Sequence, residues 1–264
     1  MAIITLTSDW GLKDYYIAVV KGAILTQYAE ATIVDISHLV PPFDIIQASF
    51  ILKNVYRNFP KGTVHIIGVN TQLEENVSHI VIYVNGHYFI GADNGIFSLI
   101  FDENPDKIIE LTTAETSGKF TFPTKDVFVK AACHIAKGGA IEELGKPKKD
   151  FWERIMLRPT VDESAIRGNV IYIDSYENVI TNISRQLFND VCKGRNFTIY
   201  LRKTDYEINS ISTSYNGVPE GEKLAIFNTM ELLEISMNQG KAATLLGLKQ
   251  NDTIRIEFHA NQNS

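Results

Sequence analysis

The chain has 264 residues, a formal net charge of −6 and 45% hydrophobic residues, so it can form one large domain or two modest ones with a substantial core. It has no strong basic block, which argues against a nucleic-acid partner. Its two cysteines, Cys133 and Cys192, provide neither a disulfide framework nor a zinc site, and no metal is expected. No basic and apolar signal pattern is present, and no apolar run approaches the roughly 20 residues of a membrane span, so we expect a cytoplasmic protein without a membrane partner.

The first predicted elements are a strand and a helix joined by a short turn. The apolar, β-branched run at 3–6 is typical of a buried strand, and apolar residues at helical spacing begin after Asp14, which we expect to cap that helix. Asp9 lies between them, where open α/β sheets bind ligands. It is interpreted either as an ordinary turn residue or as a carboxylate that accepts both hydroxyls of a ribose.

Strands and helices alternate through the rest of the first half. Further strands are predicted over 31–36, 63–69, 80–84 and 88–90. Helices are predicted over 45–55, 93–100 and 127–136, the first of them capped by Asp44. Asn85 and Gly86 separate two of the strands and form a strong hairpin signal. This order predicts an α/β domain over residues 1–158 with a mainly parallel sheet.

The second half changes character after an irregular, proline-containing stretch at 157–164, where we place a domain boundary. Short strands are predicted beyond it, over 168–174, 179–183, 197–202, 206–211, 223–228, 232–236 and 253–258. One helix is predicted, over 241–246. Short strands at this spacing predict a smaller all-β, barrel-like domain over residues 165–260.

Five segments resemble, in the same order, the motifs of one known family. They are residues 7–22, 34–45, 173–183, 215–222 and 235–240. They resemble the S-adenosylmethionine (SAM) hydroxide adenosyltransferases, the SAM hydrolases related to the fluorinating and chlorinating enzymes. The resemblance implies an N-terminal α/β domain, a C-terminal β-barrel domain and a homotrimer with each site between the first domain of one chain and the second of the next. It implies SAM as a substrate, and no cofactor is expected.

In the first half, the resemblance implies that Asp9 binds the adenosyl ribose and that Phe43 packs near the nucleoside. A simpler interpretation of Phe43 is a hydrophobic staple before the helix that Asp44 caps. His38, in the same motif, is interpreted as a loop histidine that bonds a backbone carbonyl, because one histidine without a partner is weak evidence for chemistry.

In the second half, the resemblance implies that Asp174 meets the amino group of the methionine moiety through a charge-assisted bond. Tyr176 would stack on adenine, and Asn178 would bind its Watson–Crick edge. Tyr215 lies in another matching segment. The alternative is a β-hairpin in which the polar residues only form the turn. Glu177 replaces a family glycine in this motif.

The positions that the resemblance assigns to catalysis are all changed. The hydrolases are thought to position and activate water with an Asp, an Arg and a His, and these positions are occupied here by Asn70, Val77 and Pro123. Asn70 cannot act as a general base, and Pro123 has no polar side-chain atom. Basic groups that could substitute are His79, Lys125 and Glu74.

Two further positions bear on the chemistry. Thr124 occupies the place of a halogenase serine, and the positions that hold the methionine carboxylate in halogenases are Thr229 and Met230, without an arginine. We therefore expect a divergent family member that binds SAM or adenosine at a subunit interface and has either hydrolase activity or nucleoside binding without efficient catalysis. A non-catalytic oligomeric protein is the remaining alternative.

Overall fold

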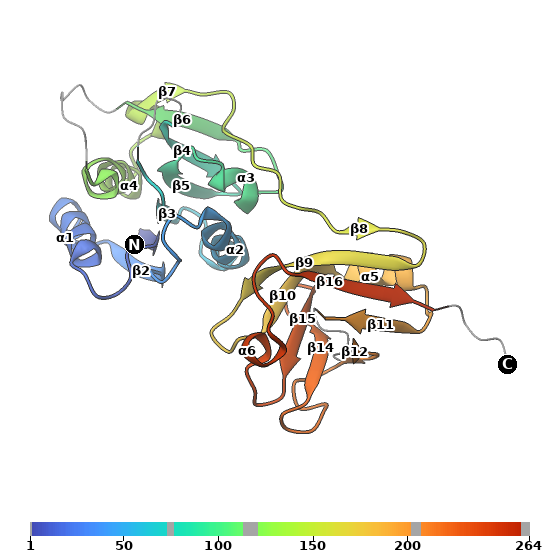
Figure 1. The fold of residues 1–264 in the computed structure, drawn as a ribbon. Coiled ribbons are helices and arrows are strands. Elements are labelled where there is room, and N and C mark those ends of the chain that lie inside the picture. Colours follow the sequence, from blue (N-terminus) through green and yellow to red (C-terminus); the bar gives the residue numbers. More distant parts are fainter. Residues whose placement is uncertain (1, 73–76, 113–120, 202–206, 260–264) are drawn as a thin grey trace. The chain divides into compact units, whose positions relative to one another are not determined.

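The computed structural model describes residues 2–72, 77–112, 121–201 and 207–259. The chain divides into two compact units, Met1–Ile155 and Met156–Ser264 (Figure 1). Each unit has its own sheet and its own buried apolar core. None of the helices in the described part is long and apolar enough to cross a membrane.

The sheet of the N-terminal unit has the order β2-β1-β3-β5-β4-β6-β7 among the described residues. The strands are β1 (Ile3–Ser8), β2 (Thr32–Ser37), β3 (Val64–Gly68), β4 (His79–Val84), β5 (His87–Ala92), β6 (Lys107–Leu111) and β7 (Gly145–Pro147). The three pairings among β2, β1, β3 and β5 are parallel, and the three among β5, β4, β6 and β7 are antiparallel. The prediction of a mainly parallel sheet is therefore wrong, because the sheet is mixed.

The hairpin at Asn85-Gly86 explains this difference. Asn85 and Gly86 have φ values of 54° and 83°, as a type I′ hairpin turn requires, and Val84 pairs with His87. The hairpin prediction is confirmed. β5 pairs parallel with β3. Since a tight hairpin joins β4 to β5, β4 runs antiparallel to both β5 and β3, and it also pairs antiparallel with β6.

Helices cover both faces of this sheet (Figure 1). Successive residues of a strand point to opposite faces, and Ile66 packs in the core with α1 (Tyr16–Gln27) and α4 (Val129–Ala136). Ile67 packs with α2 (Ile45–Val55) and α3 (Ile96–Ile100). The unit also contains the short helical segments η1 (Tyr56–Asn58), η2 (Thr124–Phe128) and η3 (Ile141–Leu144).

The two predicted helix caps have different outcomes. Asp44 caps α2, since its Oδ1 accepts the backbone N–H groups of Ile46 and Gln47 at 3.0 and 2.9 Å. The cap predicted at Asp14 is wrong. The helix begins one residue later than such a cap would allow, with Tyr15 at the cap position and no side-chain bond there.

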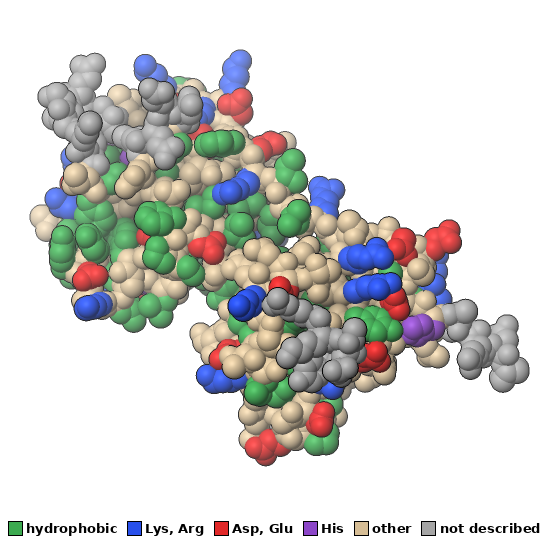
Figure 2. Space-filling view, viewed as in Figure 1, with side chains coloured by type: hydrophobic (Ala, Val, Ile, Leu, Met, Phe, Trp, Pro, Cys, Tyr) green, Lys and Arg blue, Asp and Glu red, His purple; other side chains and the backbone are tan. Residues whose placement is uncertain are grey.

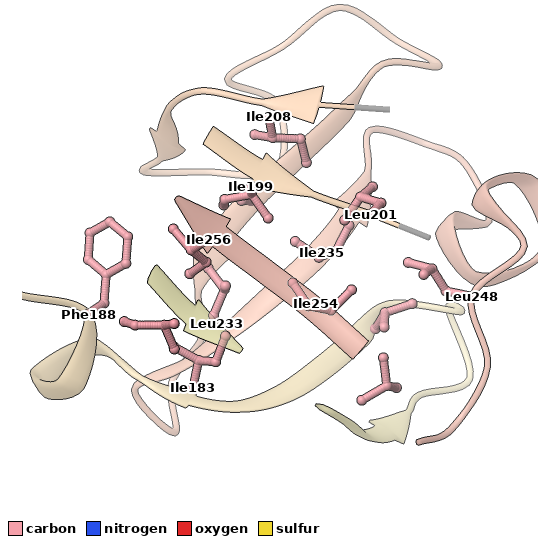
Figure 3. Close-up of a cluster of buried hydrophobic side chains, with 14 of the residues drawn as sticks. Ile183, Phe188, Ile199, Leu201, Ile208, Leu233, Ile235, Leu248, Ile254 and Ile256 are labelled. Carbon is pink, nitrogen blue, oxygen red and sulfur yellow. The ribbon is translucent and has the colours of Figure 1, made fainter. Parts of the chain in front are cut away.

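The C-terminal unit is a curled sheet of half-barrel form, with the order β12-β11-β16-β9-β10-β15-β14-β13 and β8 paired to β9. Its strands are β8 (Thr160–Val161), β9 (Ala165–Ile173), β10 (Val179–Ser184), β11 (Phe197–Tyr200), β12 (Glu207–Ile208), β13 (Ile211–Ser212), β14 (Lys223–Phe227), β15 (Leu232–Met237) and β16 (Thr253–Phe258). Inward-facing side chains such as Ile183, Ile199, Leu233 and Ile254 fill the space that the sheet encloses (Figure 3). The ends predicted at Arg202 and Tyr206 lie outside the described residues.

The prediction of an all-β unit is wrong, because the unit contains two helices. The expected one is α6 (Ala242–Leu246), and the one that was missed is α5 (Arg185–Cys192). Ser184 caps α5 by accepting the N–H of Leu187 at 3.1 Å, and Phe188 and Cys192 face the core. The cap and this helical spacing are visible in the sequence, but the segment is only two turns long.

Candidate functional site

Asp9 lies at the carboxyl end of β1 and is half-buried. Its Oδ2 accepts the backbone N–H of Phe43 at 2.9 Å. Burial raises the pKa of Asp9, while backbone N–H groups of Phe43, of Asp9 itself and of Asn70 act in the opposite direction. Asp9 therefore joins the ends of β1 and β3 to the loop before α2, and it brings three predicted site positions together.

Phe43 adopts an uncommon backbone conformation beside this carboxylate. Its φ is 66°, in the left-handed region that non-glycine residues rarely adopt, and its side chain is 66% exposed. A hydrophobic staple would be covered by its helix, so the exposed ring of Phe43 remains available to a ligand.

His38 is buried, but its side chain does not bond a backbone carbonyl, as was predicted. Its Nδ1 lies 2.7 Å from Ser8 Oγ, and its Nε2 lies 3.1 Å from Asp35 Oδ1. The ring of Trp10 stacks on the imidazole at 6.3 Å. His38 therefore fixes the turn after β1, and its backbone oxygen accepts the N–H of Gly11 at 2.8 Å.

Trp10 is a site-forming residue that the sequence reasoning missed. A Cβ at Gly68 would lie 2.5 Å from Trp10 Cζ2, so the indole lies directly on the end of β3. Tyr16 and Phe122 contact the same ring system, with centroids 6.5 and 5.2 Å from Trp10. Figure 2 shows hydrophobic side chains gathered on the surface of the unit that carries α1 and α2. The large exposed ones near this end include Leu12, Tyr15, Leu39 and Phe43.

The three positions expected to carry catalysis hold no acid or base. Asn70 has a φ of 46°, and its carbonyl oxygen accepts the amide of Asn94 at 2.9 Å. Val77 is buried, with 7% of its surface exposed. Pro123 precedes η2, a place that proline tolerates because no helical N–H is needed there.

The possible substitute groups near these positions differ in their surroundings. His79 is buried, its Nε2 donates to the carbonyl of Thr71 at 2.9 Å, and burial lowers its pKa. The Thr124 hydroxyl is fully buried and has no hydrogen-bond partner among the described residues. Lys125 pairs with Asp126 at 3.2 Å. Glu74 lies outside the described residues.

In the C-terminal unit, Asp174 organises the turn between β9 and β10. Its Oδ1 accepts the N–H groups of Tyr176 and Asn178 at 2.9 and 2.8 Å, and its Oδ2 accepts the amide Nδ2 of Asn178 at 3.0 Å. Turn formation and ligand binding are compatible here, since Oδ2 has lone pairs left and the ring of Tyr176 is 80% exposed.

A pocket of about 600 Å³ opens beside this turn. Four of the predicted site residues line it, namely Asp174, Tyr176, Asn178 and Tyr215. Ser175, the last residue of β15 (Met237) and the turn that follows it (Gln239, Gly240 and Lys241) complete the lining. We call this cavity the C-terminal pocket. Its two tyrosines, amide groups and single carboxylate suit a flat, hydrogen-bonding ligand such as a nucleobase.

Family models match both units. The description "SAM hydroxide adenosyltransferase N-terminal domain" matches residues 4–145, and "SAM hydroxide adenosyltransferase C-terminal domain" matches residues 168–255. The chain belongs to this SAM hydroxide adenosyltransferase family.

Individual relatives agree with this assignment. The (R)-S-adenosyl-L-methionine hydrolase of Thermus thermophilus is 28% identical over 94% of this chain and 97% of its own length. The enzyme of the same name from Methanocaldococcus jannaschii is 33% identical over 69% of this chain and 67% of its own length. A conserved protein of Thermotoga maritima has a similar crystal structure, with a TM-score of 0.85 and 29% identity over 97% of this chain and 99% of that one. Fluorinases are also similar, at 22% identity over 96% of this chain for that of Actinopolyspora mzabensis.

At Glu177, where the resemblance implies a glycine, the backbone has a conformation that suits glycine. The φ of Glu177 is 65°. Its carboxylate accepts the N–H of Thr244 at 3.0 Å and pairs with Lys241 at 3.1 Å, while its backbone oxygen accepts the N–H of Ala243 at 3.0 Å. These contacts offset the strain of the left-handed conformation and fix the turn against α6.

The structure thus assembles the predicted residues of this family member in two groups. Asp9 and Phe43 are in direct contact in the N-terminal unit. The other four line the C-terminal pocket. Thr229 and Met230, at the positions expected to face the methionine carboxylate, are not among the lining residues of the pocket. In the described part of the chain, no group of three or more His, Cys, Asp or Glu side chains could hold a metal.

Proposed function

We propose that this member of the SAM hydroxide adenosyltransferase family binds an adenosyl ligand, SAM or adenosine, with the base in the C-terminal pocket. The observation that carries the proposal is that Asp174, Tyr176, Asn178 and Tyr215, which come from two distant segments, line one cavity. Tyr176 stacks on the adenine, and the Asn178 amide, which keeps one N–H besides its bond to Asp174 and has an acceptor oxygen, binds its edge.

Asp9 binds the ribose in this proposal. Its Oδ2 accepts one hydrogen bond from Phe43, and a carboxylate has about four lone-pair positions, so acceptors remain for two ribose hydroxyls. The exposed ring of Phe43 packs against the nucleoside. We propose that the two groups of residues meet between neighbouring chains of a homotrimer, as the family resemblance implies.

Hydrolysis of SAM to adenosine and methionine is the reaction that this site would perform. It requires a desolvated nucleophile in line with the sulfonium leaving group. The names of the relatives specify the (R) epimer of SAM, and we extend this preference to the present chain.

A second candidate is nucleoside binding without efficient turnover. The observations in its favour are the side chains at the three positions assigned to catalysis. Val77 is buried and apolar, Pro123 leads into a helical segment, and Asn70 has no basic atom. Thr124, next to Pro123, has a buried hydroxyl without a hydrogen-bond partner among the described residues, and this hydroxyl could bind water or a halide ion.

Calorimetric titration with adenosine and with each sulfonium epimer of SAM tests binding. Incubation with each epimer, followed by chromatography for adenosine, tests turnover, and added chloride or fluoride tests for a halide nucleophile. Tyr176→Ala should weaken adenosine binding by roughly tenfold, because stacking of a base on an aromatic ring contributes about 1–3 kcal/mol.

The matched control is Tyr200→Ala. Tyr200 lies on β11 of the same unit and does not line the pocket, so its replacement should leave adenosine affinity unchanged. Failure of the wild-type protein to bind adenosine or SAM would refute the proposal. Binding without adenosine release would favour the second candidate.

A further inference from the structure

The buried carboxylate of Glu234 lies next to the C-terminal pocket and does not line it. Glu234 is on β15 and only 3% of its surface is exposed. Its Oε1 accepts the hydroxyls of Tyr215 and Ser236 at 2.9 and 2.7 Å, and its Oε2 accepts the amide of Asn228 at 3.1 Å. Among the described residues, none of the ion pairs includes Glu234. Three neutral donors therefore satisfy this buried charge.

One of these donors belongs to the wall of the pocket. The ring of Tyr215 is 47% exposed and lines the cavity, while its hydroxyl points to Glu234. Burial and the bond to Glu234 raise the pKa of Tyr215 to about 12. The phenol therefore stays protonated in the physiological range and remains a hydrogen-bond donor.

We propose that Glu234 is a positioning residue for ligand binding, which holds the ring of Tyr215 in the wall of the C-terminal pocket through the phenol hydroxyl. The inference rests on the proposed function, in which this pocket takes the adenosyl base. A ring fixed before binding loses less conformational freedom when the ligand arrives, and this increases affinity.

The hydrogen bonds around Glu234 require a carboxylate and not an amide. The Oδ1 of Asn228 accepts the backbone N–H groups of Met230 and Leu232 at 3.0 and 3.3 Å, which fixes the orientation of its amide. Its Nδ2 must then donate towards position 234. A glutamine at position 234 that kept its oxygen towards Tyr215 would present its NH₂ to the NH₂ of Asn228, so one buried donor would lose its partner.

This arrangement supplies a rescue experiment. Glu234→Gln should weaken adenosine binding by about tenfold, the effect of losing one hydrogen bond to a charged group. The double variant Glu234→Gln with Asn228→Asp exchanges donor and acceptor, so the new amide donates to a carboxylate that still accepts both backbone groups. It should bind adenosine within about twofold of wild type. Glu231→Gln, at an exposed position three residues earlier, should leave affinity unchanged.

A double-mutant cycle separates positioning from general destabilisation. In a Tyr215→Phe background the hydroxyl is absent, so Glu234→Gln should reduce affinity by no more than about twofold further. Equal losses in the two backgrounds would overturn the inference, because Glu234 would then act independently of the phenol.

A measurement without ligand keeps the inference separate from the proposed function. In protein labelled with ¹³Cζ-tyrosine, the NMR resonance lost in Tyr215→Phe identifies Tyr215. Glu234→Gln should move this resonance and the double variant should restore it. An unmoved resonance, or a moved one with unchanged affinity, overturns the positioning role. If wild type binds neither adenosine nor SAM, the proposed function fails, and the resonance still decides whether Glu234 fixes Tyr215.

Discussion

The carboxylate of Glu177 caps the backbone N–H of Thr244 at 3.0 Å while Glu177 itself holds a φ of 65°. One residue thus combines a backbone conformation that suits glycine with a side-chain contact that glycine cannot make. The turn that carries Tyr176 and Asn178 is thereby fastened to α6 through this residue.

Replacements of Glu177 should separate these two effects. Glu177→Gly relieves the left-handed strain but loses the contacts to Thr244 and Lys241, whereas Glu177→Ala loses the contacts and keeps the strain. Thermal unfolding should therefore rank alanine below glycine, with wild type at least as stable as glycine. An alanine variant as stable as wild type would contradict this account.

Asp9→Ala should reduce adenosine affinity by at least about tenfold, because hydrogen bonds to a charged acceptor contribute about 1.5–3 kcal/mol each. Calorimetric titration measures the loss. Asp44→Ala is the matched control, since Asp44 caps α2 and makes its bonds to backbone groups of its own helix. Equal binding by wild type and Asp9→Ala would exclude Asp9 from the nucleoside site.

The raised pKa of Asp9 gives a second test. In the folded protein the pKa of Asp9 lies above its ordinary value of 3.8. The free energy of unfolding therefore falls as the pH rises from 3.8 through the folded pKa, because Asp9 becomes ionised in the folded protein. Asp9→Asn should keep the bond from Phe43 and remove this cost. Urea unfolding at pH 7 should show a variant that is at least as stable as wild type and binds adenosine more weakly. A clear loss of stability would mean that the charge itself supports the fold.

His65 should make stability depend on pH in the acid range. Its Nδ1 bonds Thr5 Oγ1 at 2.7 Å, and burial, assisted by the charge of His87, lowers its pKa from 6.5 to about 3. The unfolded chain therefore takes up a proton in this window and the folded chain does not, so stability is lost as the pH falls from about 6.5 towards 3.

The slope of the free energy of unfolding against pH should approach about 1.4 kcal/mol per pH unit for this one proton. His65→Gln should flatten it in urea unfolding series at several pH values. His134→Gln is the matched control because His134 is only partly buried and bonds a backbone oxygen of a surface turn. If the His65→Gln variant kept the wild-type slope of stability against pH, the pH dependence would arise from other groups.

Turnover of SAM should be at least about a hundredfold slower than in a family member with Asp, Arg and His at the positions of Asn70, Val77 and Pro123. General acid–base catalysis typically contributes a factor of about 10²–10⁴. Adenosine release by both proteins, assayed side by side, measures the ratio. Equal rates would show that other groups, such as His79, activate the water.

Sedimentation should show a trimer at micromolar concentration. The reason is that the residues assigned to ribose and adenine lie in different units, and we propose that they meet between chains. Mixing Asp9→Ala with Asn178→Ala should restore some adenosine binding, because mixed trimers would contain interfaces without either substitution. A monomer that binds adenosine would contradict the shared site.

Local signals were the most informative part of the sequence. The Asn85-Gly86 hairpin and the Asp44 cap depend on neighbouring residues only, and both were predicted correctly. The mixed sheet was not predicted, because the choice of the strand that pairs with a hairpin depends on residues distant in the sequence. The position of Trp10 against Gly68 could not be predicted for the same reason, because this contact joins the ends of two strands that are distant in the sequence.

The candidate site also combines residues that were predicted from the sequence with one that was missed. The resemblance of the turn at Asp174 to the family motif implied contacts with adenine and methionine, and Asp174, Tyr176 and Asn178 line the C-terminal pocket. Glu234 was missed although an acidic residue in the apolar run 232–236 is an unusual feature. Its partners Tyr215 and Asn228 precede it by 19 and 6 residues, and only the fold brings their donors to one carboxylate.

The central place of β16 has a consequence for biosynthesis. β16 pairs with β11 on one side and with β9 on the other, although it is the last strand to be synthesised among those described. Until residues 253–258 leave the ribosome, the facing edges of β9 and β11 have no partner, whereas every described strand of the N-terminal sheet has already emerged. The nascent C-terminal unit therefore passes through a stage with open strand edges, which are templates for aggregation.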